Sequence, residues 1–280
     1  MLSRPKGLCL ALVGLLAAAS GAETMAEKTL RDIVERQKAA LARAEAAGDD
    51  LNEAQFKAEM QQIALSYDVL LQGSPDFVPA YVSYAQLLDR VGMAKEAVAL
   101  LLKANKLDDK IPLVKNQLAK HLAEDGKPLE ALPWLVAATD LAPNEPFYHY
   151  HLGTLLHEAR DDFLAAGQFT RPALDKAMLA AFRRAAGLEP DNFGYAYRAA
   201  EAHYDVEQPD WAAALKEWAA LEERAKPGVE KETIRLHAAN VLLKQGDRVR
   251  AGAMLALVTE PVLAKQKQTL LDQLAAAPAK

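Results

Sequence analysis

The chain has 280 residues, of which 51% are hydrophobic and 25% charged, and this much apolar surface excludes an intrinsically disordered protein. Only 6% of the residues are aromatic. Alanine, leucine, lysine, glutamate and glutamine dominate the middle of the chain, which favours helix over sheet. The formal net charge is −5 and no basic cluster stands out, so nucleic acid is not expected as a partner.

The N-terminal segment has the layout of a cleavable secretory signal. Arg4 and Lys6 precede an apolar run over 8–19, and small residues follow at 20–22. A membrane anchor is the alternative, but the run is shorter than the roughly 20 residues that a membrane span requires. We therefore expect residues 1–22 to be removed and the protein to be exported, either to the periplasm or as a secreted protein. No stable membrane insertion is expected after cleavage.

Loss of this segment would change the chemistry available to the protein. Cys9 is the only cysteine and lies inside the segment, so the exported protein would have no disulfide, thiolate metal site or cysteine nucleophile. The segment carries two basic residues and no acidic one, so its removal takes the net charge from −5 to −5 − 2 = −7.

The residues after the signal predict two helices that form a degenerate first repeat over 23–76. The pattern over 25–47 is that of one long amphipathic helix, ended by 48–50. Asn52 is placed to cap a second helix that runs to 71, where Gly73 and Pro75 close it.

A period of 34 residues organises the region 77–260. Ala85, Ala119 and Gly153 are 34 positions apart, and so are Gly92 and Gly126. A small residue at the first position allows two helices to cross closely, and a glycine between them allows the left-handed turn that ends a helix. The same spacing relates Leu88, Leu122 and Leu156, Ala97 and Ala131, and Leu101 and Leu135.

This pattern resembles the tetratricopeptide repeat, a 34-residue helix-turn-helix unit. The family's first small residue is matched by Ala85, Ala119, Gly153, Ala200 and Ala239, its second alanine by Ala97, Ala131, Ala214 and Ala251, and its terminal proline by Pro75, Pro143 and Pro190. The resemblance covers about 53–258. It implies an all-α fold, a right-handed superhelical solenoid of antiparallel helix pairs, and says little about function.

Two departures from the period are expected. The unit that opens at Pro146 is longer than 34 residues, because its second helix cannot begin before about Pro172. An insertion at about 161–171 results, and we expect its two phenylalanines, Phe163 and Phe169, to fold back onto the repeats; the alternative is that the inserted loop carries contacts to a partner. The following unit has a looser turn over 207–210. A capping helix is expected over 261–276.

In the tetratricopeptide family the first helix of each unit lines the concave groove. The resemblance therefore implies a partner-binding groove lined by Asn116, Lys120, Tyr150, Thr154, His157, Tyr197, Glu201, Tyr204, Asn240 and Lys244. Tyrosine suits recognition, because it offers apolar area and a hydrogen-bonding tip with few rotatable bonds. The alternative is that these rings pack between adjacent units.

No motif for catalysis is found. The sequence has no phosphate-binding glycine loop, no Gly-x-Ser-x-Gly elbow and no His-Glu-x-x-His helix. His157 and Asp161 could share a helix face, but zinc needs three or four ligands, so neither a metal nor a cofactor is expected. We expect a non-catalytic scaffold exported to the cell envelope that binds an unidentified protein or peptide. The alternatives are a solenoid enzyme acting on an envelope polymer and a self-associating structural subunit, and a homo-oligomer is compatible with the last.

Overall fold

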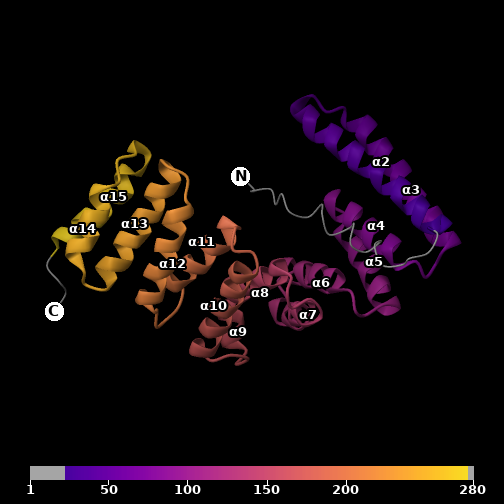
Figure 1. Cartoon of the computed structure of the whole chain (residues 1–280). Helices are drawn as coiled ribbons and strands as arrows, with labels where there is room; N and C mark the ends of the chain where they lie inside the picture. Colours follow the sequence, from indigo (N-terminus) through magenta and orange to yellow (C-terminus); the bar gives the residue numbers. More distant parts are fainter. Residues whose placement is uncertain (1–22, 277–280) are drawn as a thin grey trace. The chain divides into compact units, whose positions relative to one another are not determined.

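The computed structural model describes residues 23–276, which form helices and no strand (Figure 1). The signal predicted over 1–22 lies outside the described residues. Contacts divide the chain into two compact units, and the boundary along the sequence lies between Asp125 and Gly126. Each unit is described by itself. No helix within 23–276 is long and apolar enough to span a membrane.

The first unit begins with the two helices expected before the regular repeats. The Thr24 side chain and Glu27 form a reciprocal cap at the start of the first helix, and Asn52 accepts a hydrogen bond from the Gln55 amide at the start of the second. Their apolar faces close on a core around Leu30 and Tyr67. The helices of this unit are α2 (Met25–Ala47), η1 (Gly48–Asp50), α3 (Glu53–Gly73), α4 (Val78–Arg90), α5 (Ala94–Leu107) and α6 (Pro112–Glu124).

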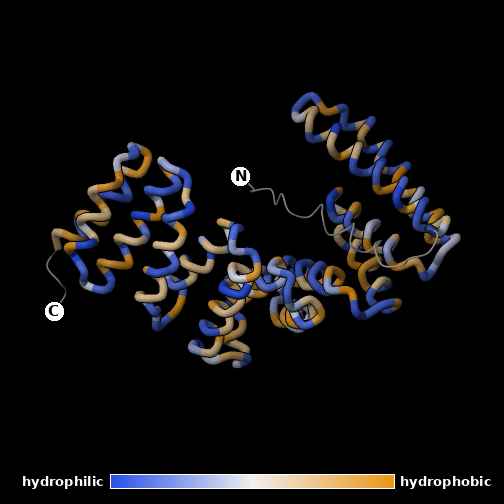
Figure 2. The backbone as a smooth tube through the Cα atoms, in the orientation of Figure 1, coloured by the Kyte–Doolittle hydropathy of each residue, from blue (hydrophilic) through white to orange (hydrophobic). Residues whose placement is uncertain are grey.

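The second unit continues the pattern of antiparallel helix pairs. Hydrophobic and hydrophilic residues are interspersed along its helices (Figure 2). Its elements are α7 (Pro128–Leu141), α8 (Pro146–Glu158), α9 (Arg160–Ala165), α10 (Arg171–Leu188), α11 (Phe193–Glu201), η2 (Ala202–Tyr204), α12 (Trp211–Arg224), α13 (Val229–Lys244), α14 (Arg248–Ala256), η3 (Pro261–Leu263) and α15 (Ala264–Ala275).

The small residues that the period predicts lie at close helix contacts. Ala85, Ala119, Ala200 and Ala239 are buried. Gly153 on α8 faces α10 so closely that a Cβ atom built there would lie 2.8 Å from two ring carbons of Phe182. A side chain larger than hydrogen would therefore force these two helices apart.

Turn glycines end the first helix of two pairs. Gly92 follows α4 with φ of +81°, and Gly246 follows α13 with φ of +77°. Other residues rarely adopt this left-handed backbone, so glycine is required for the chain to reverse direction in so few residues.

The predicted insertion is folded onto the second unit. It contains the short helix α9 and a turn at Gly167, and α10 begins at Arg171. Phe163 is fully buried and contacts the Phe169 ring edge to face, with ring centroids 5.8 Å apart. The two phenylalanines thus pack inward, as expected, rather than offering contacts to a partner.

A single carboxylate holds the C-terminal cap. Glu232 accepts hydrogen bonds from the backbone amides of Thr259 and Glu260 at 2.6 and 2.7 Å, and from the Thr259 hydroxyl at 2.9 Å. The hydrogen bond from the Glu260 amide, together with those from the amide and hydroxyl of Thr259, holds the pKa of the Glu232 carboxyl below its ordinary value. The segment between α14 and α15 is therefore anchored to α13.

Candidate functional site

Three of the predicted groove residues meet around His237 in the second unit. Tyr197 comes from α11 and its hydroxyl lies 2.7 Å from Nε2 of His237 on α13. The hydroxyl of Tyr204, at the end of η2, donates to the His237 carbonyl at 3.2 Å and also hydrogen-bonds the Asn240 side chain. The imidazole stacks on Trp218 of α12, with ring centres 4.2 Å apart and an angle of 6° between the planes. We call Tyr197, Tyr204, Trp218, His237 and Asn240 the His237 cluster.

The buried surroundings keep this cluster uncharged near neutral pH. Burial lowers the pKa of His237 to about 4. It also raises the pKa of Tyr197, and it raises that of Tyr204 to about 12 although the hydrogen bond with Asn240 acts in the opposite direction. The cluster therefore presents neutral rings, hydroxyls and an amide rather than an acid, a base or a nucleophile.

Tyr150 forms a second aromatic group, built from α8, α10 and α11. Its ring meets Phe182 at 5.7 Å and Tyr195 at 5.1 Å between centroids. Thr154, one turn along α8, donates its hydroxyl to the Tyr150 carbonyl. The predicted tyrosines thus pack between adjacent helix pairs, as the alternative interpretation expected, and their half-buried edges remain at the surface.

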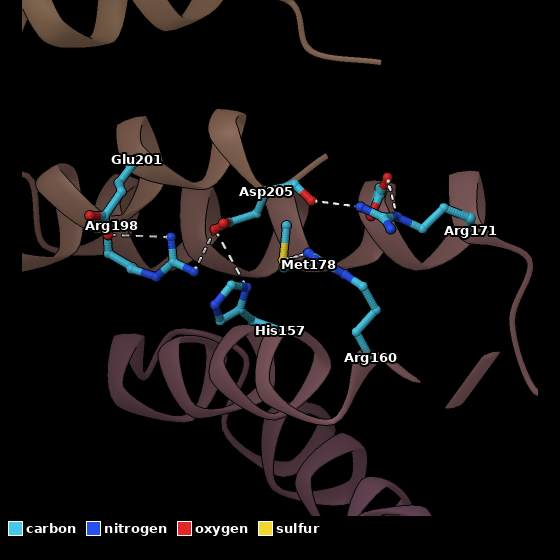
Figure 3. Close-up of polar contacts among 8 residues, drawn as sticks. His157, Arg160, Arg171, Met178, Arg198, Glu201 and Asp205 are labelled. Atoms are coloured by element: carbon cyan, nitrogen blue, oxygen red, sulfur yellow. Dashed lines mark hydrogen bonds and ion pairs between the residues drawn. The ribbon is translucent and has the colours of Figure 1, made fainter. Parts of the chain in front are cut away.

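A polar network joins α8, α10 and α11 at Asp205 (Figure 3). Oδ2 of Asp205 accepts a hydrogen bond from Arg198 at 2.9 Å and lies 3.4 Å from Nδ1 of His157, and both side chains point toward the carboxylate in the figure. Arg171 donates to the Asp205 carbonyl at 2.8 Å. Glu201 lies 3.6 Å from Arg198 at the edge of the network. His157 therefore faces Asp205 and not Asp161, its predicted neighbour.

The same network fixes the irregular segment after η2. Arg171 also holds Asp175 through both carboxylate oxygens, and Asp175 accepts from the backbone amide of Glu207 at 2.8 Å. The charges here are paired with each other, which indicates a bracing role.

A buried histidine lies behind this surface. His203 is 1% exposed, and its Nε2 lies 2.9 Å from Arg183 and 3.4 Å from Glu217. Burial would raise the pKa of the Glu217 carboxyl, but the hydrogen bond with His203 and the charge of Arg183 outweigh it and the pKa lies below its ordinary value. His203 is therefore a buried residue of the core whose ring is held by polar partners.

The remaining predicted groove residues are placed as follows. Asn116 and Lys120 lie on α6 in the first unit, where Lys120 pairs with Asp89 at 2.8 Å. Asn116 is 3% exposed, so its prediction as a surface residue was wrong, because the pattern identifies a helix face but not how far neighbouring side chains cover it. Lys244 is exposed at the end of α13.

No group of three or more histidine, cysteine, aspartate or glutamate side chains that could hold a metal ion converges within residues 23–276. The acidic residues whose pKa values are displaced, Glu27, Glu217, Glu232 and Asp247, all have them lowered. A general acid of the kind that the enzyme hypothesis requires would need a raised value.

Comparison with known proteins identifies the fold. The peptide-binding protein YrrB, described as "a TPR protein with an unusual peptide-binding site", matches with a TM-score of 0.56 and 18% identity over 75% of this chain and 94% of its own. The chain has the tetratricopeptide-repeat fold. The type IV pilus biogenesis factor PilW matches with a TM-score of 0.54 and 14% identity over 89% of this chain and all of its own.

A further match extends over most of the tetratricopeptide-repeat stack. PilF of Pseudomonas aeruginosa has a TM-score of 0.53 and 15% identity, over 86% of this chain and 99% of its own. No protein-family model and no curated protein matches the sequence. At these identities the likeness establishes the tetratricopeptide-repeat fold and leaves the partner open.

Proposed function

We propose that the protein is an exported, non-catalytic scaffold that binds a peptide or an extended protein segment along α8, α11 and α13 of its second unit. The observation that carries the proposal is the His237 cluster. Side chains from successive repeats meet there, where the His237 ring is stacked on Trp218 and the hydroxyls of Tyr197 and Tyr204 are hydrogen-bonded to His237. Rigid aromatic side chains lose little entropy on binding, which makes them suitable anchors.

Two charged side chains flank the cluster and would give a bound segment its direction. Glu201 on α11 is 42% exposed at its side chain, and Lys244 on α13 is exposed. Backbone or side-chain groups of a peptide lying across the rings could reach both. A neutral aromatic centre with charged borders resembles the apolar core and polar rim of protein interfaces.

Peptide selection tests the binding proposal. We expect the full chain to enrich particular sequences from a displayed random peptide library. Tyr204→Phe and Lys244→Ala should each lower the affinity for the selected peptides by about tenfold, as measured by fluorescence anisotropy. Matched controls are Tyr81→Phe, which removes a hydroxyl bonded to the Pro75 carbonyl in the first unit, and Lys265→Ala on α15. Equal losses in the control and site variants would contradict the assignment, and so would a failure to enrich any sequence.

Export is tested separately. The proposal predicts that the protein recovered from outside the cytoplasm begins at Glu23, which Edman sequencing or intact mass would show. Contacts of the first helix support this start, because Glu23 pairs with Arg31 and Thr24 forms the cap. Recovery of the chain only from the cytoplasm with residues 1–22 intact would contradict export and leave the binding proposal untouched.

A further inference from the structure

An apolar groove lies between α12 and α14, and no residue of the His237 cluster lines it. The groove encloses about 500 Å³ and has the buried Leu242 of α13 at its base. Its walls come from α12 and α14, and Leu257 is half exposed there. The full lining is Ala212, Leu215, Lys216, Ala219, Leu242, Arg250, Ala253, Met254 and Leu257.

The charges at the groove are positive. Lys216 and Arg250 are its only charged lining residues. Arg250 is paired with Asp247, whereas Lys216 has no polar partner within the described residues. An apolar floor with an unpaired cation at its wall suits an apolar helix face that carries an acidic residue.

The first unit presents such a helix face on α3. Leu65 and Val69 are 54% and 68% exposed, four positions apart and therefore on one side of the helix. Within 23–276 they are the only exposed large hydrophobic residues with this spacing on one helix. Asp68 lies beside them and is the single charged residue over 61–72.

We propose that the α3 face of one copy binds in the α12–α14 groove of a second copy, with Leu65 and Val69 in the groove and Asp68 paired with Lys216. Burial of two aliphatic side chains would supply the attraction, and the ion pair would fix the direction of the helix. The two surfaces differ, so the contact is head to tail, and an open assembly retains one free α3 face at one end and one free groove at the other unless a ring closes.

Light scattering on the full chain tests the proposal. We expect the mean mass to rise with concentration between about 1 and about 100 µM, and Leu65→Glu or Lys216→Glu to lower the association constant by about tenfold or more. The matched controls are Leu102→Glu on α5, where the leucine is 50% exposed, and Lys265→Glu on α15. All variants carry residues 1–22, so any association through that segment is common to them.

A charge exchange provides the sharper test. Asp68→Lys and Lys216→Asp should each weaken association, and the double variant should restore it. Asp68 hydrogen-bonds Tyr84, so thermal unfolding must first show that Asp68→Lys remains folded. A wild-type chain that stays monomeric over the whole range would overturn the proposal, as would control variants that weaken association equally or an exchange that fails to rescue. Peptide binding at the His237 cluster is independent of each of these outcomes.

Discussion

Replacing Gly153 with valine is expected to destabilise the second unit by about 3 kcal/mol or more. A Cβ atom at this position would lie 2.8 Å from ring carbons of Phe182, and Phe182 cannot retreat because it is buried between Tyr150 and the Arg198 guanidinium. Gly153→Ala should cost less, because the better helix propensity of alanine, about 1 kcal/mol, offsets part of the clash. Urea unfolding followed by tryptophan fluorescence measures this effect selectively, since all three tryptophans lie in the second unit.

Two further variants isolate the cause. Gly187 lies in α10 with nothing within 4 Å of its added Cβ, so Gly187→Ala should stabilise the unit by up to about 1 kcal/mol. Removing the obstructing ring with Phe182→Leu should reduce the additional cost of Gly153→Ala in the double variant. A Gly153→Val protein with the wild-type midpoint would show that the α8–α10 contact is looser than the structure indicates.

Acidification is expected to remove about 3 kcal/mol of stability through His237 alone. Burial lowers the pKa of this imidazole from an ordinary 6.5 to about 4. The unfolded chain therefore takes up a proton below about pH 6.5 while the folded chain resists it until about pH 4. The stabilisation is fully present above pH 6.5 and is lost as the pH falls through this interval.

Carboxylates titrate in the same pH interval and also change the stability, so the contribution of His237 must be measured as a difference between the wild type and a variant without this histidine. We would compare urea midpoints of the wild type and His237→Phe from pH 7 to pH 4, because phenylalanine keeps the stacking on Trp218 and cannot be protonated. The wild type should lose more stability than the variant, by about 3 kcal/mol over the range. Parallel curves for the two proteins would mean that His237 is more accessible to water than its packing indicates.

Much of the fold follows from steric requirements that recur in the sequence. Positions such as Ala85, Ala119 and Gly153 must be small wherever two helices cross, and Gly92 must be glycine because of its left-handed backbone. These requirements are local and repeat every 34 residues, so one sequence is enough to reveal them. The helix over Met25–Ala47 and its successor after Asn52 could likewise be predicted from their caps and apolar spacing.

The candidate site was less predictable because it depends on which faces meet. Tyr197, Tyr204 and Asn240 were identified as groove residues, but their common neighbour His237 was not, since the repeat pattern does not show which side chains of successive helices touch. One missed signal was available. Arg183 and Glu217 are 34 residues apart with opposite charges, and they form an ion pair between successive repeats.

Hydrogen exchange on the full chain with a library-selected peptide tests the central claim most directly. If the peptide lies along α8, α11 and α13, backbone amides in Phe193–Tyr204 and in the second half of α13 should exchange more slowly when it is bound, while amides of α12 and α14 should not change. Slowing confined to α12 and α14, or to the first unit, would contradict the assignment of the binding face to the His237 cluster.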